Sequence, residues 1–295
     1  MRTRLFTWTA LTIGLTVASR ADAQRDRRTS LDTTFSFDKS GTVVVGGGSA
    51  SVVVTSWDQS TIRVRGRAED GYLQFEASSR RVTIAPSRSG DDAIIQVTVP
   101  RGVRIEAHSR DGDISIKGTR GDVDATTGSG DVQVVEAGAV TAASLSGSVY
   151  VTQATGAVDV TSSNGDLILR QCSGTVDANS VSGDVNIDRS TSKSVKASTT
   201  SGDVAFGGTL IAQGTYSLTS HSGDIEIALE KDASAQISFT TWSGSVDSEF
   251  PITIKPASGS SPDITKHFTF TLGGGAAKLT AETFSGDIVL RSKGG

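Results

Sequence analysis

A four-residue motif, Ser-Gly-Asp followed by Val, Leu or Ile, recurs through most of this chain at a nearly constant interval. Between Asn164 and Ser222, neighbouring copies are 18 to 21 residues apart. A period of this kind is typical of a solenoid, whose units bury their apolar faces only when they stack on one another. The repeat therefore indicates the fold, while it indicates no activity. The copies, including one in which Asn replaces Ser, begin at Ser129, Asn164, Ser182, Ser201, Ser222 and Ser285.

Each repeat divides into two halves of about nine residues. A weaker copy of the motif lies halfway between neighbouring copies, as at Gly138 and Gly156. Within each half, the second and fourth residues after the glycine are apolar, as in Val185 and Ile187. Such alternation places one set of side chains on one face of a short strand. Two strands therefore make one coil.

The sequence predicts an all-β fold, a single right-handed parallel β-solenoid (β-helix) with about 18–21 residues per coil, over residues 35–292. Consecutive strands on each face then pair in parallel with their counterparts one coil away. We expect Val185, Ile187, Val204 and Ile225 to be fully buried in inward-facing ladders. The motif glycines are expected to supply a positive φ at each corner, and the aspartates to hydrogen-bond the backbone of their own turns.

The first residues have the order of a secretory signal peptide. Arg2 and Arg4 precede an apolar stretch from Leu5 to Ala18, and the small-residue site Ala21-Asp22-Ala23 closes the segment. The apolar stretch is shorter than the ~18 residues that cross a bilayer. We expect residues 1–23 to be a cleaved signal peptide and residues 24–34 a flexible leader. The mature chain is then exported to the periplasm, the cell surface or the extracellular space, without a membrane span.

Charge is unevenly distributed along the chain. Without the predicted signal peptide, the formal net charge of −4 becomes −6. Residues 24–120 carry 15 basic and 12 acidic side chains, whereas residues 121–295 carry 10 and 19. Nucleic acid is disfavoured as a partner, because phosphate binding needs a concentrated basic face. The single cysteine, Cys172, cannot form an intramolecular disulfide and is expected to be a small buried hydrophobe.

The chain resembles the bacterial DUF4097 family, whose members are described as adhesins. The resemblance covers roughly residues 35–292 and rests on the array of Ser-Gly-Asp-Val/Ile motifs and on the segments before it. These segments are Val53–Asp58 running into Ile62-Arg63-Val64, and Val97–Pro100 running into Asp111–Ile114. The resemblance implies a secreted or cell-envelope β-helix. The family has no established catalytic residues to transfer to this chain.

Aspartates one coil apart would lie about 4.8 Å from one another if the coils stack at strand spacing. Such a ladder could bind cations, but the calcium-binding nonapeptide Gly-Gly-x-Gly-x-Asp needs glycines that this chain lacks. We therefore expect a structural ladder that binds no metal. Its members include Asp166, Asp184, Asp203 and Asp224.

If the chain is an enzyme, the candidate class is a polysaccharide lyase or hydrolase, because several parallel β-helices cleave acidic sugars with carboxylate clusters. Such sites need long loops, whereas the coils between Gly112 and Gly223 vary by only a few residues. The histidines, His108, His221 and His267, lack metal-ligand spacing. No catalytic, cofactor-binding or metal-ligating residue is therefore expected, and no cofactor.

Aromatic side chains and one loop depart most from the repeat. Tyr150 has outward parity, and Trp242 and Phe284 both lie two residues before a motif glycine. The loop Pro256–Pro262 is rich in Ser, Gly and Pro. These features predict either a recognition surface near the C-terminal coils or a cap over the open sheet edge. Capping is favoured for Phe284, and both roles stay open for Trp242.

The combined prediction is an exported, non-catalytic β-solenoid that acts as an adhesin or envelope scaffold. It would bind an envelope protein or a glycan through its surface, and its oligomeric state is open. The alternatives are a carbohydrate-active lyase or hydrolase on the same fold, and a periplasmic sensory module for envelope stress.

Overall fold

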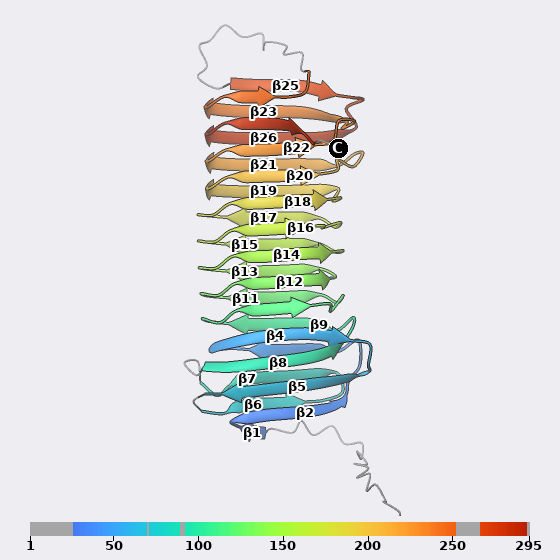
Figure 1. Cartoon of the computed structure of the whole chain (residues 1–295), viewed down its shortest axis with the longest axis vertical. Helices are drawn as coiled ribbons and strands as arrows, with labels where there is room; N and C mark the ends of the chain where they lie inside the picture. Colours follow the sequence, from blue (N-terminus) through green and yellow to red (C-terminus); the bar gives the residue numbers. More distant parts are fainter. Residues whose placement is uncertain (1–25, 70, 89–91, 252–265, 294–295) are drawn as a thin grey trace, which may run out of the picture.

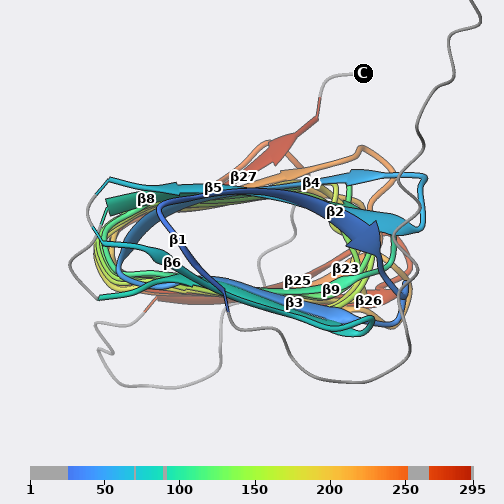
Figure 2. The same cartoon turned by 90° about the horizontal axis from the view of Figure 1, so that it is seen from below.

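The computed structural model describes residues 26–69, 71–88, 92–251 and 266–293, and this part of the chain contains strands and no helix. Twenty-seven strands, β1 to β27, form two long sheets that face each other. The strands stack into a tall column whose N-terminal coils lie at one end, blue in Figure 1. Viewed along its axis, the column has a flattened, two-layered cross-section (Figure 2). None of the described segments is a helix long and apolar enough to cross a membrane.

We call the two layers sheet A and sheet B and give their strands in spatial order. Sheet A contains β1 (Asp26–Arg28), β6 (Leu73–Ala77), β7 (Arg81–Pro86), β3 (Thr42–Gly46), β9 (Arg104–Ser109), β11 (Val123–Thr127), β13 (Val140–Ser144), β15 (Val158–Ser162), β17 (Val176–Ser180), β19 (Ser194–Ser201), β21 (Thr215–Ser222), β26 (Ala277–Ser285), β23 (Ala235–Ser243) and β25 (Lys266–Leu272). Sheet B contains β2 (Ser30–Ser36), β5 (Thr61–Ala68), β8 (Asp92–Pro100), β4 (Ser49–Trp57), β10 (Ile114–Lys117), β12 (Val132–Ala137), β14 (Val149–Ala154), β16 (Leu167–Arg170), β18 (Val185–Ser190), β20 (Val204–Gly208), β22 (Ile225–Leu229), β27 (Ile288–Ser292) and β24 (Val246–Ser248).

From β9 to β22 each coil contributes one strand to each sheet, and the strands of neighbouring coils pair in parallel. The register places equivalent positions of the repeat side by side, as in Val149, Leu167 and Val185 along sheet B. The prediction of an all-β solenoid with two strands per coil is therefore confirmed.

The core is a set of apolar ladders between the two sheets. Val185, Val204 and Ile225 are fully buried, and Ile187 has an exposed fraction of only 1%. These four positions confirm the inward parity that the sequence predicts. Their neighbours along the axis are also Val, Ile, Leu or Phe, so each ladder continues without a polar break from coil to coil.

The coils at both ends of the column are not stacked in sequence order. The last coil, β26 and β27, lies between the coil β21–β22 and the coil β23–β24, as the position of the red strand β26 shows in Figure 1. At the other end, β3 and β4 lie between β7–β8 and β9–β10. Strand β25 covers the end of sheet A by pairing antiparallel with β23. The repeat in the sequence does not predict this insertion of the C-terminal coil between earlier coils.

The ordered array also begins earlier than the predicted domain boundary at residue 35. Strand β1 pairs antiparallel with β6, and β2 pairs antiparallel with β5 along Ser30–Ser36. Most of the segment 24–34, expected to be a flexible leader, therefore belongs to the first strands. The predicted signal peptide, residues 1–23, and the loop Pro256–Pro262 lie outside the described residues.

Candidate functional site

The motif aspartates form a hydrogen-bonded ladder along one corner of the column, in which the hydroxyl of Ser148 takes the place of one carboxylate. Each carboxylate accepts the backbone N–H of the equivalent residue in the next coil, as in Asp184 N–H to Asp166 Oδ1 (3.0 Å) and Asp203 N–H to Asp184 Oδ1 (2.8 Å). The last described step runs from Ser245 N–H to Asp287 Oδ1 (2.7 Å), and this backbone hydrogen bond lowers the pKa of Asp287. The aspartates thus stabilise the next coil rather than their own turn.

A second ladder at the same corner occupies the carbonyl groups of the motif glycines. A buried hydroxyl reaches each carbonyl oxygen from the strand that precedes the next motif, as in Thr199 Oγ1 to Gly183 O (2.9 Å) and Ser220 Oγ to Gly202 O (2.9 Å). The apolar pattern of the repeat does not predict this ladder, because its hydroxyl positions are polar. The sequence feature that could have predicted it is the Ser or Thr that recurs three residues before the motif glycine.

The motif glycines are required by close packing and not by a positive φ. Of the glycines in the motif column, only Gly202, at φ 158°, has a positive value. A Cβ atom at Gly183 would instead lie closer than 3.0 Å to the carbonyl oxygen of Gly165 in the preceding coil. The expectation that these corners need the left-handed region is therefore wrong. The glycines let the backbones of successive coils approach closely.

The described residues contain no group of three or more His, Cys, Asp or Glu side chains placed to hold a metal ion. The histidines are far apart in the array: His108 is on β9, His221 on β21 and His267 on β25. Both ring nitrogens of His267 lie within hydrogen-bond distance of threonine hydroxyls, Thr240 at 3.0 Å and Thr269 at 3.2 Å. Cys172 is buried, as expected, and burial raises the pKa of its thiol to about 11.

Three aromatic rings stack at the corner of the C-terminal coils. Phe284 lies between His221, at a ring-centroid distance of 5.0 Å, and Trp242, at 6.0 Å. This order exists because β26 is inserted between β21 and β23. Phe284 and Trp242 are 49% and 38% exposed, and the rings face one another along the column. The arrangement favours corner packing over a flat binding platform, especially for Phe284, which has an aromatic neighbour on each side.

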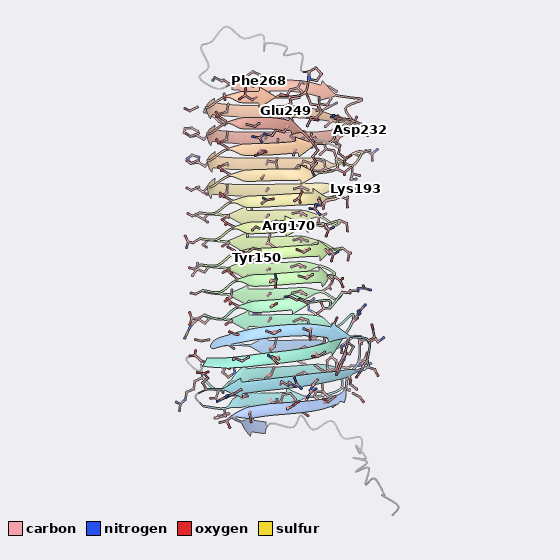
Figure 3. All side chains as sticks on the ribbon, in the orientation of Figure 1. Tyr150, Arg170, Lys193, Asp232, Glu249 and Phe268 are labelled. Atoms are coloured by element: carbon pink, nitrogen blue, oxygen red, sulfur yellow. The ribbon has the colours of Figure 1, made fainter. Side chains whose placement is uncertain are left out.

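The outer face of sheet B is open and carries a row of side chains with the same parity. Tyr150, labelled in Figure 3, has the outward parity of β14. Its partners on the neighbouring strands are Gln133 and Ile168. The residue is half-buried. The outward position predicted for Tyr150 is thus confirmed.

The same face has a shallow hollow near the N-terminal coils, which we call the sheet B hollow. Strands β4, β8 and β5 lie side by side here, because β4 is inserted next to β8. The hollow has a volume of about 290 Å³. Its lining residues are Val53, Thr55, Trp57, Arg63, Arg65, Gln96, Val97 and Thr98.

Two cross-strand rows make up most of the hollow. One row runs from Val53 through Gln96 to Arg65, and the other from Thr55 through Thr98 to Arg63. The hydroxyls of Thr55 and Thr98 lie 3.2 Å apart. Trp57 closes one end, and its indole N–H donates to the carbonyl oxygen of Thr61 at 2.6 Å, which fixes the ring.

One carboxylate serves both arginines of the hollow. Asp32 accepts hydrogen bonds from Arg63 Nε (3.1 Å) and Nη2 (3.0 Å), and Arg65 Nε lies 3.4 Å from Asp32 Oδ2. The hydrogen bonds from Arg63 are the main cause of the lowered pKa of Asp32. Two guanidinium groups against one carboxylate leave a local excess of positive charge. Sequence reasoning missed this site, although Trp57, Arg63 and Arg65 all have outward parity.

A second hollow, of about 320 Å³, lies on the neighbouring part of the same sheet and has the opposite character. Its lining includes Glu69, Asp92 and Asp111 together with Ile94. A hydrogen bond from Arg110 is the main cause of the lowered pKa of Asp111. Two hollows of opposite charge thus lie on the N-terminal part of sheet B.

Comparison with known proteins agrees with this architecture. The family model described as Toastrack DUF4097 matches residues 39–291, which is most of the chain. The chain belongs to the Toastrack DUF4097 family. The resemblance seen in the sequence is therefore confirmed, and the match covers nearly the whole stacked array. A search of the curated proteins finds no protein that matches this chain.

Three solved structures match most of this chain at low sequence identity and low TM-score. A "putative adhesin" from Bacteroides fragilis is 12% identical, with a TM-score of 0.34 over 88% of this chain and 96% of that one. A "putative adhesin" from Parabacteroides merdae is 8% identical, with a TM-score of 0.29 over 90% and 97%. A "putative cell adhesion protein" from Clostridium sporogenes is 7% identical, with a TM-score of 0.24 over 90% and 100%. Similarity at this level carries no argument about function.

Proposed function

We propose that this Toastrack protein is an exported, non-catalytic recognition column that binds a glycan or an envelope protein through its outer surface. The observation that carries the proposal is the sheet B hollow, where Trp57, Arg63 and Arg65 meet on an open sheet face. Aromatic and arginine side chains are the groups most enriched at recognition surfaces. The N-terminal sequence pattern of residues 1–23 supports the export part of the proposal.

The column is well suited to presenting such a surface. The aspartate and hydroxyl ladders tie each coil to the next, so the outward side chains are held on a rigid support. A binding surface loses less entropy on association when it is preorganised in this way. Recognition therefore needs no mobile lid or enclosed cavity.

Four described carboxylates have environments that do not suit a general acid. Four aspartates have clearly shifted pKa values, and all four are lowered by arginine or backbone and hydroxyl donors: Asp32, Asp38, Asp111 and Asp287. A glycosidase needs a carboxylic acid whose pKa is raised towards neutrality. None of these four groups suits that role.

Two measurements test the proposal. Purified protein without residues 1–23 is screened on a glycan array and in pull-downs from envelope extracts, and we expect a saturable partner in one of them. The full chain is expressed in its host with fractionation, and we expect a mature N-terminus at Gln24 outside the cytoplasm. A protein that stays cytoplasmic, or one that binds no partner while it cleaves a polysaccharide, would refute the proposal.

A further inference from the structure

The sheet B hollow combines three kinds of group that seldom meet on a regular sheet face. Trp57 offers an apolar ring held in place by its bond to Thr61. Thr55, Thr98 and Gln96 offer neutral donors and acceptors on the floor. Arg63 and Arg65 offer guanidinium groups along one side, with side chains 38% and 50% exposed. An apolar ring beside polar and cationic groups matches a ligand that has an apolar face, hydroxyls and a carboxylate.

The charged side chains around the sheet B hollow favour an anionic ligand. Asp32 neutralises one of the two arginines, since it is the only carboxylate that the described contacts give to Arg63 and Arg65. Lys117 adds a further exposed cation, because it pairs with Thr55 from the other side of β4. Arg63 holds Asp32 through two hydrogen bonds, which leaves Arg65 as the less fully paired arginine. Lys117 on β10 and Arg65 on β5 therefore place a cation on each side of the hollow, three strand spacings or about 14 Å apart across the sheet.

The geometry also favours a chain over a compact ligand. The hollow is about 290 Å³, just below the ~300–1,000 Å³ of small-molecule sites. It is open along the sheet face, so a bound ring can extend to further residues on either side. The cations on the two sides of the hollow, Lys117 and Arg65, would meet successive anionic groups of such a chain.

We infer that the sheet B hollow binds a polysaccharide of uronic acids, with one sugar ring against Trp57 and its carboxylate on Arg65. This inference rests on the proposed function and names the ligand class of that surface. The C–H face of a pyranose packs on an indole ring, and guanidinium groups bind carboxylates through charge-assisted hydrogen bonds. Thr55, Thr98 and Gln96 supply partners for the sugar hydroxyls.

Single-stranded nucleic acid also combines rings with anions, but the hollow lacks the long basic groove that it needs. Backbone tracking needs a groove that is basic over several phosphates. Beyond the hollow, the outer rows of sheet B carry both signs of charge: Arg170 and Arg291, together with Asp188, Glu226 and Asp247. Any polyanion, a uronate included, would meet these carboxylates, so only the segment at the hollow is bound, and nucleic acid serves as an arm of the test.

The experiment measures binding of the protein without residues 1–23 to four probes by calorimetry and fluorescence of its tryptophans. The probes are an oligogalacturonate octamer, an oligoalginate octamer, the methyl-esterified oligogalacturonate, and an eight-residue thymidine oligonucleotide. We expect at least one uronate to bind, with affinity that falls as salt rises. The methyl ester, which keeps the ring and lacks the charge, is expected to bind at least about 10-fold more weakly than its acid.

A matched pair of variants locates the site. Arg65→Gln removes a guanidinium from the hollow, whereas Arg67→Gln makes the same charge change on β5 outside it. We expect Arg65→Gln to weaken uronate binding about 10-fold or more and Arg67→Gln to weaken it less than about 2-fold. Trp57→Phe, which keeps a ring, is expected to bind more tightly than Trp57→Leu. Melting temperatures of all variants show whether they are folded.

Three results would overturn the inference. They are no binding of either uronate, equal losses in Arg65→Gln and Arg67→Gln, and binding of the thymidine oligonucleotide that exceeds that of both uronates. A protein that binds a neutral glycan or an envelope protein but neither uronate would refute this inference and leave the proposed function standing.

Discussion

The Asp203 carboxylate accepts a hydrogen bond of 2.8 Å from the backbone N–H of Asp224, the equivalent residue one coil further along the column. Asp224 in turn accepts the N–H of Asp287 at 2.8 Å, although 63 residues separate the two in sequence. The same side chain therefore connects coils whether they are neighbours in sequence or only in space. The aspartate of the repeat stabilises stacking at the corners, where the strand ladders are interrupted.

Asp203→Ala is expected to destabilise the fold by about 0.5–1.5 kcal/mol, because the N–H of Asp224 loses its acceptor at a partly solvated corner. Asp203→Asn keeps an oxygen that can accept the bond and should recover part of the loss. Urea unfolding followed by circular dichroism measures both changes. Asp159→Ala, an exposed aspartate on the outer face of sheet A, is the control and should be nearly neutral. Equal losses at Asp203 and Asp159 would contradict a role for the ladder.

Ile187→Asp places a charge in the buried apolar ladder of sheet B, whereas Asn186→Asp places the same group on the outer face. The first change is expected to cost more than about 3 kcal/mol, because an unpaired charge is strongly disfavoured in an apolar interior. The second should stay within about 0.5 kcal/mol of the parent. Thermal melting measures both, and equal melting temperatures would refute the inward assignment of Ile187.

Gly183→Ala tests whether the motif glycine is needed for close approach of the coils. The added Cβ would meet the Gly165 carbonyl oxygen at less than 3.0 Å, so we expect a loss of about 1–3 kcal/mol from forced backbone movement. Gly274→Ala is the matched control, because its Cβ would meet only Ser234 Oγ at 3.6 Å. Gly274→Ala should be neutral or slightly stabilising, because alanine lowers the conformational entropy of the unfolded chain. If both substitutions have the same effect on the free energy of unfolding, the packing explanation is wrong.

Much of the fold could be predicted from the repeat, because the alternation of apolar residues and the repeat length together determine which side chains of each strand face inward. Val185 and Ile187 are two residues apart after a glycine, and this spacing suffices to place both inward. The stacking order of the end coils could not be predicted in this way. The motif that starts at Ser285 matches its neighbours in sequence, so its pattern is compatible with any position in the stack.

The candidate site depends on that unpredicted order. The sheet B hollow exists because β4 lies against β8, which brings Val53 beside Gln96. The two residues are far apart in sequence, and nothing in their local pattern specifies the pairing. The sequence does show that Trp57, Arg63 and Arg65 have outward parity. This parity identifies the three residues as candidates for a surface site, but it does not show that they lie together.

The buried thiol of Cys172 predicts a specific dependence of stability on pH. Burial raises its pKa from 9.0 to about 11 in the folded protein. The folded state therefore favours the protonated thiol, and this contribution is fully present below about pH 9 and is lost as the pH rises towards 11. A difference of this size corresponds to about 2–3 kcal/mol.

Urea unfolding of the parent and of Cys172→Ala at about pH 8 and pH 10.5 measures this contribution. The parent should lose more stability between the two pH values than the variant does. Tyr216, whose pKa burial also raises, is present in both proteins, so its titration cancels in the comparison. The same loss in both proteins would contradict the shift at Cys172.

Substitutions in the stack of His221, Phe284 and Trp242 can distinguish a capping role from a recognition role at the C-terminal coils. Phe284→Ser removes contacts with both His221 and Trp242, and it should cost about 1–2 kcal/mol, because each ring pair contributes roughly 0.5–1.5 kcal/mol. Trp242→Ser removes one such pair and should cost less. Leu145→Ser, at the equivalent position of a middle coil and 59% exposed, is the control and should be nearly neutral.

Each of these three variants is compared with the parent by thermal melting and by binding to whichever partner the array or the pull-down identifies. Corner packing predicts a lower melting temperature for Phe284→Ser with unchanged affinity, because the ring faces are occupied by one another. A recognition role predicts the reverse, lost affinity with little change in melting. If Trp242→Ser loses affinity while Phe284→Ser does not, the outermost ring of the stack contacts the partner, and recognition extends from sheet B to this corner.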